Sequence, residues 1–318
     1  MEKIEILEFD NNEDVILTRY GENLLDRKYI TNPAIERDEE IKKMILALLI
    51  PEKSAILVGK PGVGKTALVE GLAYQIQQGT VPNVLKKYQI IKINISALLG
   101  TTSQDGNTET KIQTLVEELK TKENVILFID EIHTLIGASA NNSIDFANML
   151  KTGLDRGSIK IIGATTTEEF DFYLVKDRAF LRRFEKIEIE EPDQETTVKI
   201  LIGSLPKIEV QTGAKLDYSP FVLKLIIKFI VNMTSEYKRL FEATSKYPDI
   251  SFTLLIKAFA FAIFDNQDKV TFKHIYEAIS SFDKIYPDVL KKEKIAFQKQ
   301  FHNFLEEENV DLNKFKDS

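Results

Sequence analysis

Residues 59–66 read Gly59-Lys60-Pro61-Gly62-Val63-Gly64-Lys65-Thr66, which satisfies the G-x-x-x-x-G-K-[ST] pattern of a phosphate-binding loop. The run before it, residues 54–58, is short, apolar and β-prone, and apolar residues recur at helical spacing over residues 67–73. A strand, a glycine-rich loop and a helix therefore follow in the order that this motif requires. The alternative is a plain glycine turn between two core elements, and the match at every fixed position argues against it.

The residue types in this loop suit the binding of a nucleoside triphosphate. Glycines allow backbone conformations that a Cβ would forbid, and they bring N–H groups close to phosphate oxygens at the positive end of the helix dipole. We expect Lys65 to reach the β- and γ-phosphates and Thr66 to offer its hydroxyl to Mg²⁺. The predicted cofactors are ATP and Mg²⁺, and the predicted binding residues in the loop are Pro61, Gly62, Val63, Gly64, Lys65 and Thr66.

Composition narrows the class of protein. The chain has 318 residues, of which 43% are hydrophobic, so it can bury the core of one large or two medium domains. It has no cysteine and three histidines, which excludes disulfides and thiolate metal sites and argues against zinc. A net charge of −7 argues against general nucleic-acid binding. With no signal-peptide pattern and no apolar run that could span a bilayer, we expect a soluble cytoplasmic protein without a membrane partner.

A second motif follows the apolar run at residues 125–129. This run has the composition of a buried strand and ends in Asp130-Glu131, a Walker B pattern. Because ligands of parallel sheets collect at the carboxyl ends of the strands, we expect Asp130 to hold the hydration shell of Mg²⁺. We expect Glu131 to orient and deprotonate the attacking water. His133 and Thr134, just beyond, are interpreted as structural residues.

The strand predicted at residues 160–166 has a polar end rich in threonine. A hydroxyl at this end can hydrogen-bond the γ-phosphate or the water, which is the role of a sensor. The alternative is a threonine-rich turn that caps the next helix, and we favour that alternative for Thr165 and Thr167.

Three arginines, Arg178, Arg182 and Arg183, precede a last strand at residues 186–189. Two adjacent arginines usually form a solvated patch. Here, however, they lie where a ring ATPase would direct cations at its neighbour's nucleotide.

Three strings in this order resemble the first ATPase module of the Clp family of AAA+ unfoldases and disaggregases. Residues 55–73, 125–137 and 163–192 are similar to the family strings ILxGxPGVGKTAxVEGLA, ILFIDEIHTLxGA and GATTxxEY…LxRRF…xxEP, and the similarity covers roughly residues 20–210. The resemblance implies an α/β fold, that of an AAA+ P-loop NTPase with a parallel sheet flanked by helices and a small all-helical lid. It also implies ATP hydrolysis in a homo-oligomeric ring, expected to be a hexamer.

The resemblance assigns further roles by position. It implies Lys65 and Thr66 for phosphate and Mg²⁺, Asp130 and Glu131 for Mg²⁺ and water, Thr166 as the first sensor, Arg182 with Arg183 as fingers that act on a neighbouring subunit, and Ile35 at the adenine.

The chain departs from the family pattern at three places. Glu36 stands where the family usually has glycine, so we expect the backbone to differ there. Residues 103–106, Ser-Gln-Asp-Gly, align with the Lys-Tyr-Arg-Gly pore loop of the family, so Gln104 replaces the aromatic residue that grips a threaded polypeptide. The lid motif, Pro248-Asp249-Ile250-Ser251, brings no arginine to act as a second sensor.

The resemblance, together with the helical periodicity after about residue 194, implies four domains or segments along the chain. They are a lead-in at residues 1–30, a large nucleotide-binding subdomain at 31–192, a helical lid at 193–285 and a C-terminal helical tail at 286–318. Within the lid we expect helices near residues 196–205, 220–233, 251–264 and 271–282. A set of phenylalanines there could form a binding stripe, but we favour lid core: Phe252, Phe259, Phe261, Phe264 and Phe272.

Two classes of function remain open. The first is an ATP-hydrolysing ring motor that remodels protein substrates, in the manner of a chaperone, with a reduced grip on a threaded chain. The second is a nucleotide-switched assembly or loading factor whose ring or filament organises a partner without threading it. The nucleotide motifs favour the first class, and Gln104 favours the second.

Overall fold

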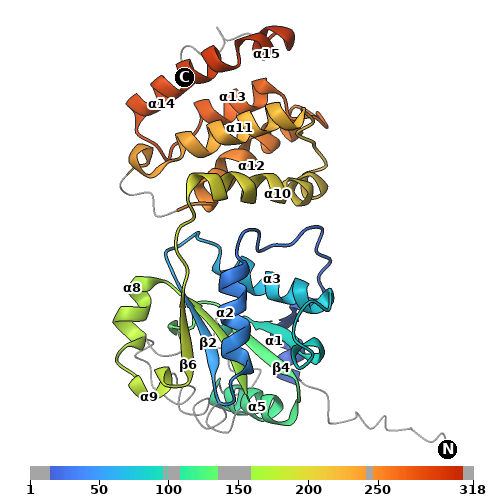
Figure 1. Cartoon of the computed structure of the whole chain (residues 1–318), viewed down its shortest axis with the longest axis vertical. Coiled ribbons are helices and arrows are strands. Elements are labelled where there is room, and N and C mark those ends of the chain that lie inside the picture. The colour runs from blue at the N-terminus through green and yellow to red at the C-terminus, as the bar shows by residue number, and fades with distance from the viewer. Residues whose placement is uncertain (1–14, 96–97, 99–107, 135–158, 241–245, 311–318) are drawn as a thin grey trace, which may run out of the picture. The chain divides into compact units, whose positions relative to one another are not determined.

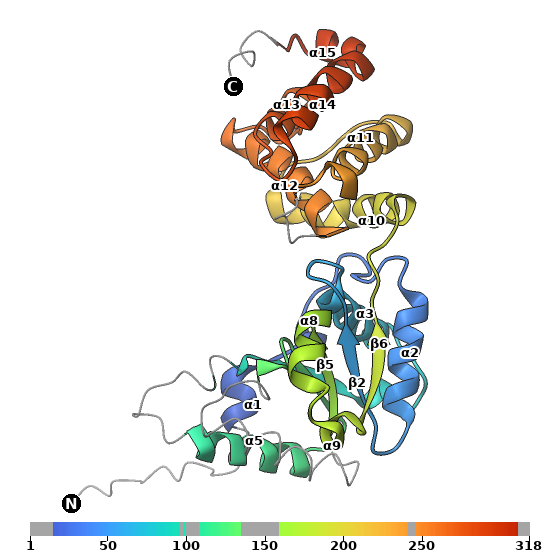
Figure 2. The same cartoon turned by 90° about the vertical axis from the view of Figure 1, so that its left-hand side faces the viewer.

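The computed structural model describes residues 15–95, 98, 108–134, 159–240 and 246–310. The chain packs as two compact units. The first unit contains Met1–Arg27, Met44–Ile56 and Gln75–Lys186, and the second contains Lys28–Lys43, Leu57–Tyr74 and Ile187–Ser318. Figures 1 and 2 show the strands grouped in one sheet and the C-terminal helices gathered in one bundle.

The described residues form a mixed, mostly parallel sheet of six strands in the order β1-β3-β4-β5-β2-β6. Strands β3, β4 and β5 pair in parallel, while β1 is antiparallel to β3 and places Glu22 opposite Lys92. The lead-in had no predicted strand, so its contribution of an antiparallel edge is a new finding. The strands are β1 (Gly21–Asn23), β2 (Ser54–Val58), β3 (Gln89–Ile93), β4 (Val125–Ile129), β5 (Lys160–Thr165) and β6 (Phe184–Glu188).

Two of these strands are buried at every position because both of their faces are covered. All five residues of β2 and all five of β4 are buried, which matches the continuous apolar runs that the sequence shows before each chemical motif. The polar residues of each motif begin where the strand ends. The polar residues of both motifs therefore lie at the ends of strands β2 and β4.

The lead-in is tied to the first unit by a carboxylate. Glu118, on α5 (Thr108–Thr121), accepts hydrogen bonds from the backbone N–H groups of Ile16 and Leu17, each at 2.9 Å. These N–H groups belong to the first turn of α1 (Val15–Tyr20), where helical N–H groups have no partner within the helix. A side chain distant in sequence thus supplies the cap of this short helix.

The remaining elements around the sheet are short, apart from α2 and α3. They are α2 (Asp38–Leu49), α3 (Lys65–Gln77), α8 (Thr167–Glu169), the π-helix η3 (Phe170–Leu174), α9 (Arg178–Leu181), and the 3₁₀ turns η1 (Leu24–Asp26) and η2 (Leu85–Lys87).

The C-terminal bundle has its own apolar core. Phe259 and Phe272 are fully buried in it, and Phe252 and Phe261 pack against it, which confirms the prediction of lid core for these four, whereas Phe264 is 82% exposed. The predicted C-terminal amphipathic helix packs on the same core through Phe297 and other residues, although Ile295 is exposed. The bundle elements are α10 (Gln194–Thr212), α11 (Pro220–Met233), η4 (Glu236–Lys238), α12 (Asp249–Phe264), α13 (Phe272–Ser280), α14 (Pro287–Gln300) and α15 (His302–Glu307).

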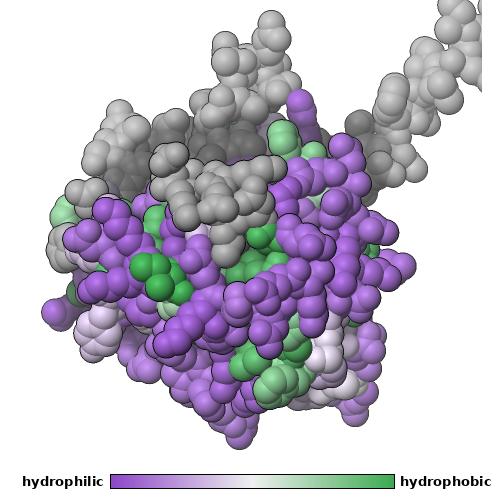
Figure 3. Space-filling view, turned by 90° about the horizontal axis from the view of Figure 1, so that it is seen from above, coloured by the Kyte–Doolittle hydropathy of each residue, from purple (hydrophilic) through white to green (hydrophobic). Residues whose placement is uncertain are grey.

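The surface at the end of the molecule that carries the C-terminal helices is mainly hydrophilic. Figure 3, seen from above, shows separate small apolar patches among hydrophilic side chains. No helix within the described ranges combines the length and the apolar character needed to cross a membrane.

Candidate active site

The predicted site residues divide between the two units. The phosphate loop and Ile35 lie in the second unit, and Asp130, Glu131, Thr166, Arg182 and Arg183 lie in the first. The pore-loop residues 103–106 lie outside the described residues.

The phosphate loop has the backbone that its glycines predict. Gly62 has φ +78° and Gly64 has φ +100°, both in the left-handed region. At Gly59, an added Cβ would lie 2.3 Å from the carbonyl oxygen of Ile189, so only glycine fits. At Gly64, an added Cβ would meet nothing within 4 Å. The loop therefore leaves open space at the N-terminus of α3, where helical N–H groups bind phosphate.

Lys65 is the first residue of α3 and folds back over the loop. Its ammonium nitrogen donates to the carbonyl oxygens of Gly59 at 2.7 Å and Lys60 at 3.1 Å. Thr66 follows on the same helix and is half-buried. Both side chains thus lie at the helix terminus that faces the loop.

The segment before α2 packs beside this loop within the second unit. A Cβ on Gly71 of α3 would lie 2.3 Å from Ala34 Cβ, and a Cβ on Gly203 of α10 would lie 2.6 Å from Ile35 Cδ1. Glycines at these two positions let residues 34 and 35 approach both helices closely. Ile35 therefore packs closely against α10, and its contact with adenine stays a prediction.

Glu36 keeps a backbone conformation that favours glycine. Its φ is +58°, in the left-handed region that few non-glycine residues adopt. Its carboxylate forms an exposed ion pair with Lys199 of α10 at 2.9 Å. Glu36 thus has the left-handed backbone that glycine would adopt easily, and the prediction that the backbone differs from that of the family stays a prediction.

Arg37 is a residue of the site that the sequence did not single out. It stands among charged residues in the sequence, yet it is only 9% exposed. Its guanidinium donates to the carbonyl oxygens of Val63 at 3.2 Å and Glu190 at 3.0 Å, and to Glu40 at 2.8 Å. Arg37 thus fastens the phosphate loop to two other segments of the second unit.

The lid also reaches the phosphate loop. Asp249 is the first residue of α12, and its Cβ lies 2.8 Å from the place where a Cβ on Gly62 would stand. The lid motif therefore packs Asp249 against this glycine, and none of its four residues, 248–251, is an arginine.

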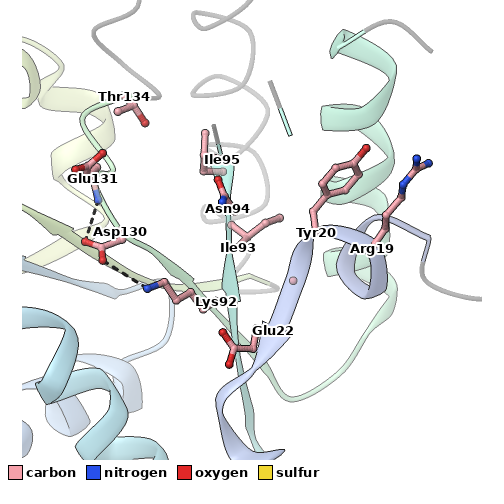
Figure 4. Close-up of a pocket in the computed structure, with 11 residues that line it drawn as sticks. Arg19, Tyr20, Glu22, Lys92, Ile93, Asn94, Ile95, Asp130, Glu131 and Thr134 are labelled. Atoms are coloured by element: carbon pink, nitrogen blue, oxygen red, sulfur yellow. Dashed lines mark hydrogen bonds and ion pairs between the residues drawn. The ribbon is translucent and has the colours of Figure 1, made fainter. Parts of the chain in front are cut away.

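The Walker B carboxylates follow β4 in the first unit. Asp130 lies 3.7 Å from the Lys92 ammonium of β3, and its Oδ1 accepts the Glu131 N–H at 3.2 Å (Figure 4). Glu131 is exposed and has φ +52°, a strained value for a non-glycine residue. A cavity of about 470 Å³ opens between these carboxylates and the lead-in residue Tyr20.

Lys92 links Asp130 to a chain of alternating charges. On its other side it stands opposite Glu22 in the β1–β3 pair, and Glu22 in turn accepts a hydrogen bond from Arg27 Nη2 at 2.7 Å. The hydrogen bond from Arg27, and then the charges of Arg27 and Lys92, hold the pKa of Glu22 below its usual value against the opposing effect of burial. The Lys92 ammonium also lies 5.6 Å from the centre of the Phe128 ring.

Thr166 forms a helix cap at the end of β5. Its hydroxyl accepts the N–H of Glu169 at 3.2 Å, and the Glu169 carboxylate accepts the N–H of Thr166 at 2.9 Å. This is a capping box at the start of α8. The Thr166 hydroxyl is thus engaged by Glu169, and its sensor role stays a prediction. Thr165, for which capping was favoured over sensing, is buried beside His133 instead.

The two predicted finger residues differ in their surroundings. Arg182 is exposed, and its carbonyl oxygen accepts a hydrogen bond from Lys53 at 2.9 Å. Arg183 is half-buried, and its guanidinium donates to the carbonyl oxygen of Ala179 on α9. Of the pair, Arg182 has the side chain that extends into solvent.

Comparison with known proteins shows which family the central part of the chain resembles. A family model described as "ATPase family associated with various cellular activities (AAA)" matches residues 55–191. These residues form an AAA module. The AAA module contains both motifs, from the strand before the phosphate loop to Glu191, and this match confirms the predicted fold class.

Curated relatives of the chain are ClpB chaperones. The protein named "Chaperone protein ClpB" of Aquifex aeolicus is 44% identical over 213 residues, which are 66% of this chain and 21% of the relative. That of Clostridium perfringens is 40% identical over 211 residues, which are 65% of this chain and 24% of the relative. The resemblance to the Clp family is confirmed, and the chain spans about a quarter of the length of these relatives.

Solved structures of Hsp104 have the same fold. The closed state of Hsp104 with ATPγS and FITC casein is 31% identical with a TM-score of 0.70, covering 83% of this chain and 44% of that one. The S. cerevisiae Hsp104–ADP complex is 32% identical with a TM-score of 0.68, covering 82% and 44%. The AAA module and the helical bundle that follows it are therefore similar to one part of a longer Clp-type ATPase.

Proposed function

We propose that this chain hydrolyses ATP as the motor module of a Clp-type protein-remodelling assembly. The observation that carries the proposal is the phosphate loop, with left-handed Gly62 and Gly64 and open space at the N-terminus of α3. The ClpB relatives and Hsp104 neighbours support it, because they match this chain across its AAA module.

Each predicted residue has one role in the proposed reaction. Lys65 binds the β- and γ-phosphates, Ile35 contacts the adenine, and Glu131 takes a proton from the attacking water. Thr166 senses the γ-phosphate, and Arg182 with Arg183 stabilises charge on the nucleotide of a neighbouring subunit. The proposed assembly is a homo-oligomeric ring, expected to be a hexamer.

The donor set fits Mg²⁺ bound together with a nucleotide. Mg²⁺ is usually held by one or two protein oxygens, with phosphates and water completing its shell. Asp130 and Thr66 would supply the protein oxygens, and the ion would neutralise charge on the phosphates.

The test compares three variants in equilibrium ATP binding and phosphate release. Lys65→Ala is expected to lose ATP binding, and Glu131→Gln is expected to bind ATP but turn it over very slowly. Lys42→Ala, which removes an exposed lysine of α2 outside the site, is the matched control and should behave as wild type. Full turnover by Glu131→Gln would contradict the proposed base.

The second candidate, an assembly or loading factor, rests on Gln104 in the sequence of the expected pore loop. A polar side chain there supplies little contact area for a threaded chain, and stripping a domain works against a stability of roughly 5–15 kcal/mol. We therefore expect weak unfolding of a folded, tagged fluorescent substrate, and stronger unfolding by Gln104→Tyr. Robust unfolding by wild type would favour the motor without reduced grip.

A further inference from the structure

The loop that carries Glu131 is fastened to the end of β5 at consecutive positions. The N–H of Ile132 donates to the carbonyl oxygen of Ala164 at 3.0 Å. The Ile132 side chain is fully buried, and a Cβ on Gly163 would lie 2.7 Å from its Cδ1. The Ile132 side chain therefore occupies the space that a side chain at position 163 would need. His133, the next residue, continues this contact with its side chain.

One carboxylate oxygen gathers three donors at this junction. Glu169 Oε2 lies 3.1 Å from His133 Nδ1, 3.1 Å from the Thr165 hydroxyl and 2.9 Å from the Thr166 N–H. Thr165 is 2% exposed, and the side chains of His133 and Glu169 are 15% and 33% exposed, so the cluster is partly shielded from water. We call these four residues, His133, Thr165, Thr166 and Glu169, the brace.

The geometry of the brace requires a proton on His133 Nδ1. The Thr165 hydroxyl donates to Glu169, so its oxygen is available to accept from Nδ1, which lies 3.1 Å away. A lone pair on Nδ1 would instead face a carboxylate oxygen at 3.1 Å without an intervening proton. The N–H at Nδ1 is therefore shared between the Thr165 oxygen and the Glu169 carboxylate.

The electrostatics agree with an ionised Glu169. Burial by itself would raise the pKa of Glu169, but hydrogen bonds from the Thr166 backbone and hydroxyl, the charge of His133 and the Thr165 hydroxyl together hold it below its usual value. The His133 ring also stacks on Tyr173 of η3, with centroids 5.7 Å apart and planes at 22°. The ring is thus fixed by a carboxylate at one edge and an aromatic face.

We propose that the brace fixes the positions of Glu131 and Thr166 relative to each other, and that His133 is a positioning residue for ATP hydrolysis. Glu131 has a strained, left-handed backbone, and such a conformation persists only where surrounding contacts determine it. Ile132 and His133 are the residues that supply those contacts from the loop. This inference rests on the proposed roles of Glu131 and Thr166 in the nucleotide site.

A purely structural reading gives the brace one task, which is to cap α8. The two readings differ in what a variant changes. Loss of a cap lowers the free energy of unfolding. A shift of Glu131 relative to Thr166 instead lowers the rate of the chemical step and leaves nucleotide binding intact. Misplacing a catalytic group by about 1 Å can cost about 10²-fold in rate.

The experiment compares His133→Leu with His133→Asn. Asparagine carries its amide N–H as far from Cβ as histidine carries Nδ1–H, so it can reach Glu169, whereas leucine cannot. We expect His133→Leu to lower kcat about 10- to 100-fold with the Kd for a fluorescent ATP analogue changed less than about twofold. We expect His133→Asn to recover most of that loss. Tyr173→Phe, which keeps the stacked ring, is the matched control and should turn over as wild type.

A second readout does not depend on hydrolysis. The chain has three histidines, so few imidazole signals are expected in ¹⁵N spectra of labelled protein. The signals that are missing from the spectrum of His133→Asn belong to His133. Their chemical shifts report whether Nδ1 of His133 carries a proton. A protonated Nδ1 supports the brace even if the protein proves to have no ATPase activity, which would contradict only the proposed function. An unprotonated Nδ1 overturns the brace. An unchanged kcat in His133→Leu overturns the positioning role. So does a His133→Leu protein whose lower kcat is accompanied by weaker nucleotide binding and a lower melting temperature, because that pattern indicates a general loss of structure.

Discussion

Arg37→Met should destabilise the second unit and weaken its grip on nucleotide. The guanidinium is largely buried and donates to two carbonyl oxygens, those of Val63 and Glu190, besides its ion pair with Glu40. A hydrogen bond to a charged group contributes about 1.5–3 kcal/mol, and methionine can replace the stem of the side chain but neither bond. Because hydration of the part-buried Glu190 carbonyl offsets part of that loss, we expect the free energy of unfolding to fall by about 2–4 kcal/mol.

The assay for Arg37→Met is urea unfolding followed by circular dichroism, with binding of a fluorescent ATP analogue measured in parallel. Since Val63 lies within the phosphate loop, we expect weaker nucleotide binding along with the lower stability. Glu40→Gln is the control, because it removes the ion pair and keeps both carbonyl bonds, and it should cost about 1 kcal/mol or less. An Arg37→Met protein within about 0.5 kcal/mol of wild type would refute the account of this residue as a clamp.

Three further predictions concern the other charged groups. Arg182→Ala/Arg183→Ala subunits mixed with Lys65→Ala subunits should regain some hydrolysis at mixed interfaces, where a cation acting on a neighbour's nucleotide is worth about 10³–10⁵ in rate; undiminished turnover by a strictly monomeric protein would contradict this. Lys92→Gln should lower the Mg²⁺ concentration for half-maximal ATP binding about two- to fivefold, because Lys92 lies 3.7 Å from Asp130 and repels a second cation there; a Mg²⁺ titration showing no change would show that Lys92 does not compete. Burial lowers the pKa of His274 against the opposing charge of Asp265, so as pH falls below about 6.5 the unfolded state takes up a proton that the folded state does not. Unfolding free energy should therefore drop by up to about 1.4 kcal/mol between pH 7.5 and 5.5 in wild type and less in His274→Gln, and equal slopes in the two proteins would refute it.

The chemical motifs of this chain were predictable because their signals are local. The phosphate loop needs glycine at fixed offsets between a strand and a helix, and the left-handed φ of Gly62 and Gly64 follows from that need. The buried strands before each motif were visible as uninterrupted apolar runs. The bundle helices were predictable for the same reason, because their periodicity is carried within each segment.

The contribution of the lead-in was not predictable at the same level. β1 is three residues long, and no alternation in so short a run distinguishes a strand from a loop. Its pairing with β3 and the capping of α1 by Glu118 depend on residues about 70 and 100 positions away along the chain. A short edge strand of this kind is specified by its partner rather than by its own sequence.

The sequence by itself determined which residues we propose to contact phosphate and water, because those residues stand in short patterns. Only the tertiary structure decided how those residues are held. Arg37 looked like one charge in a solvated run, and its burial depends on Glu190, which is 153 positions away. His133 looked structural, and its partners Thr165 and Glu169 lie on the next strand and helix. A side chain's partners across the fold leave no periodic signal in the sequence, so its role as a clamp or a brace appears only once the chain has folded.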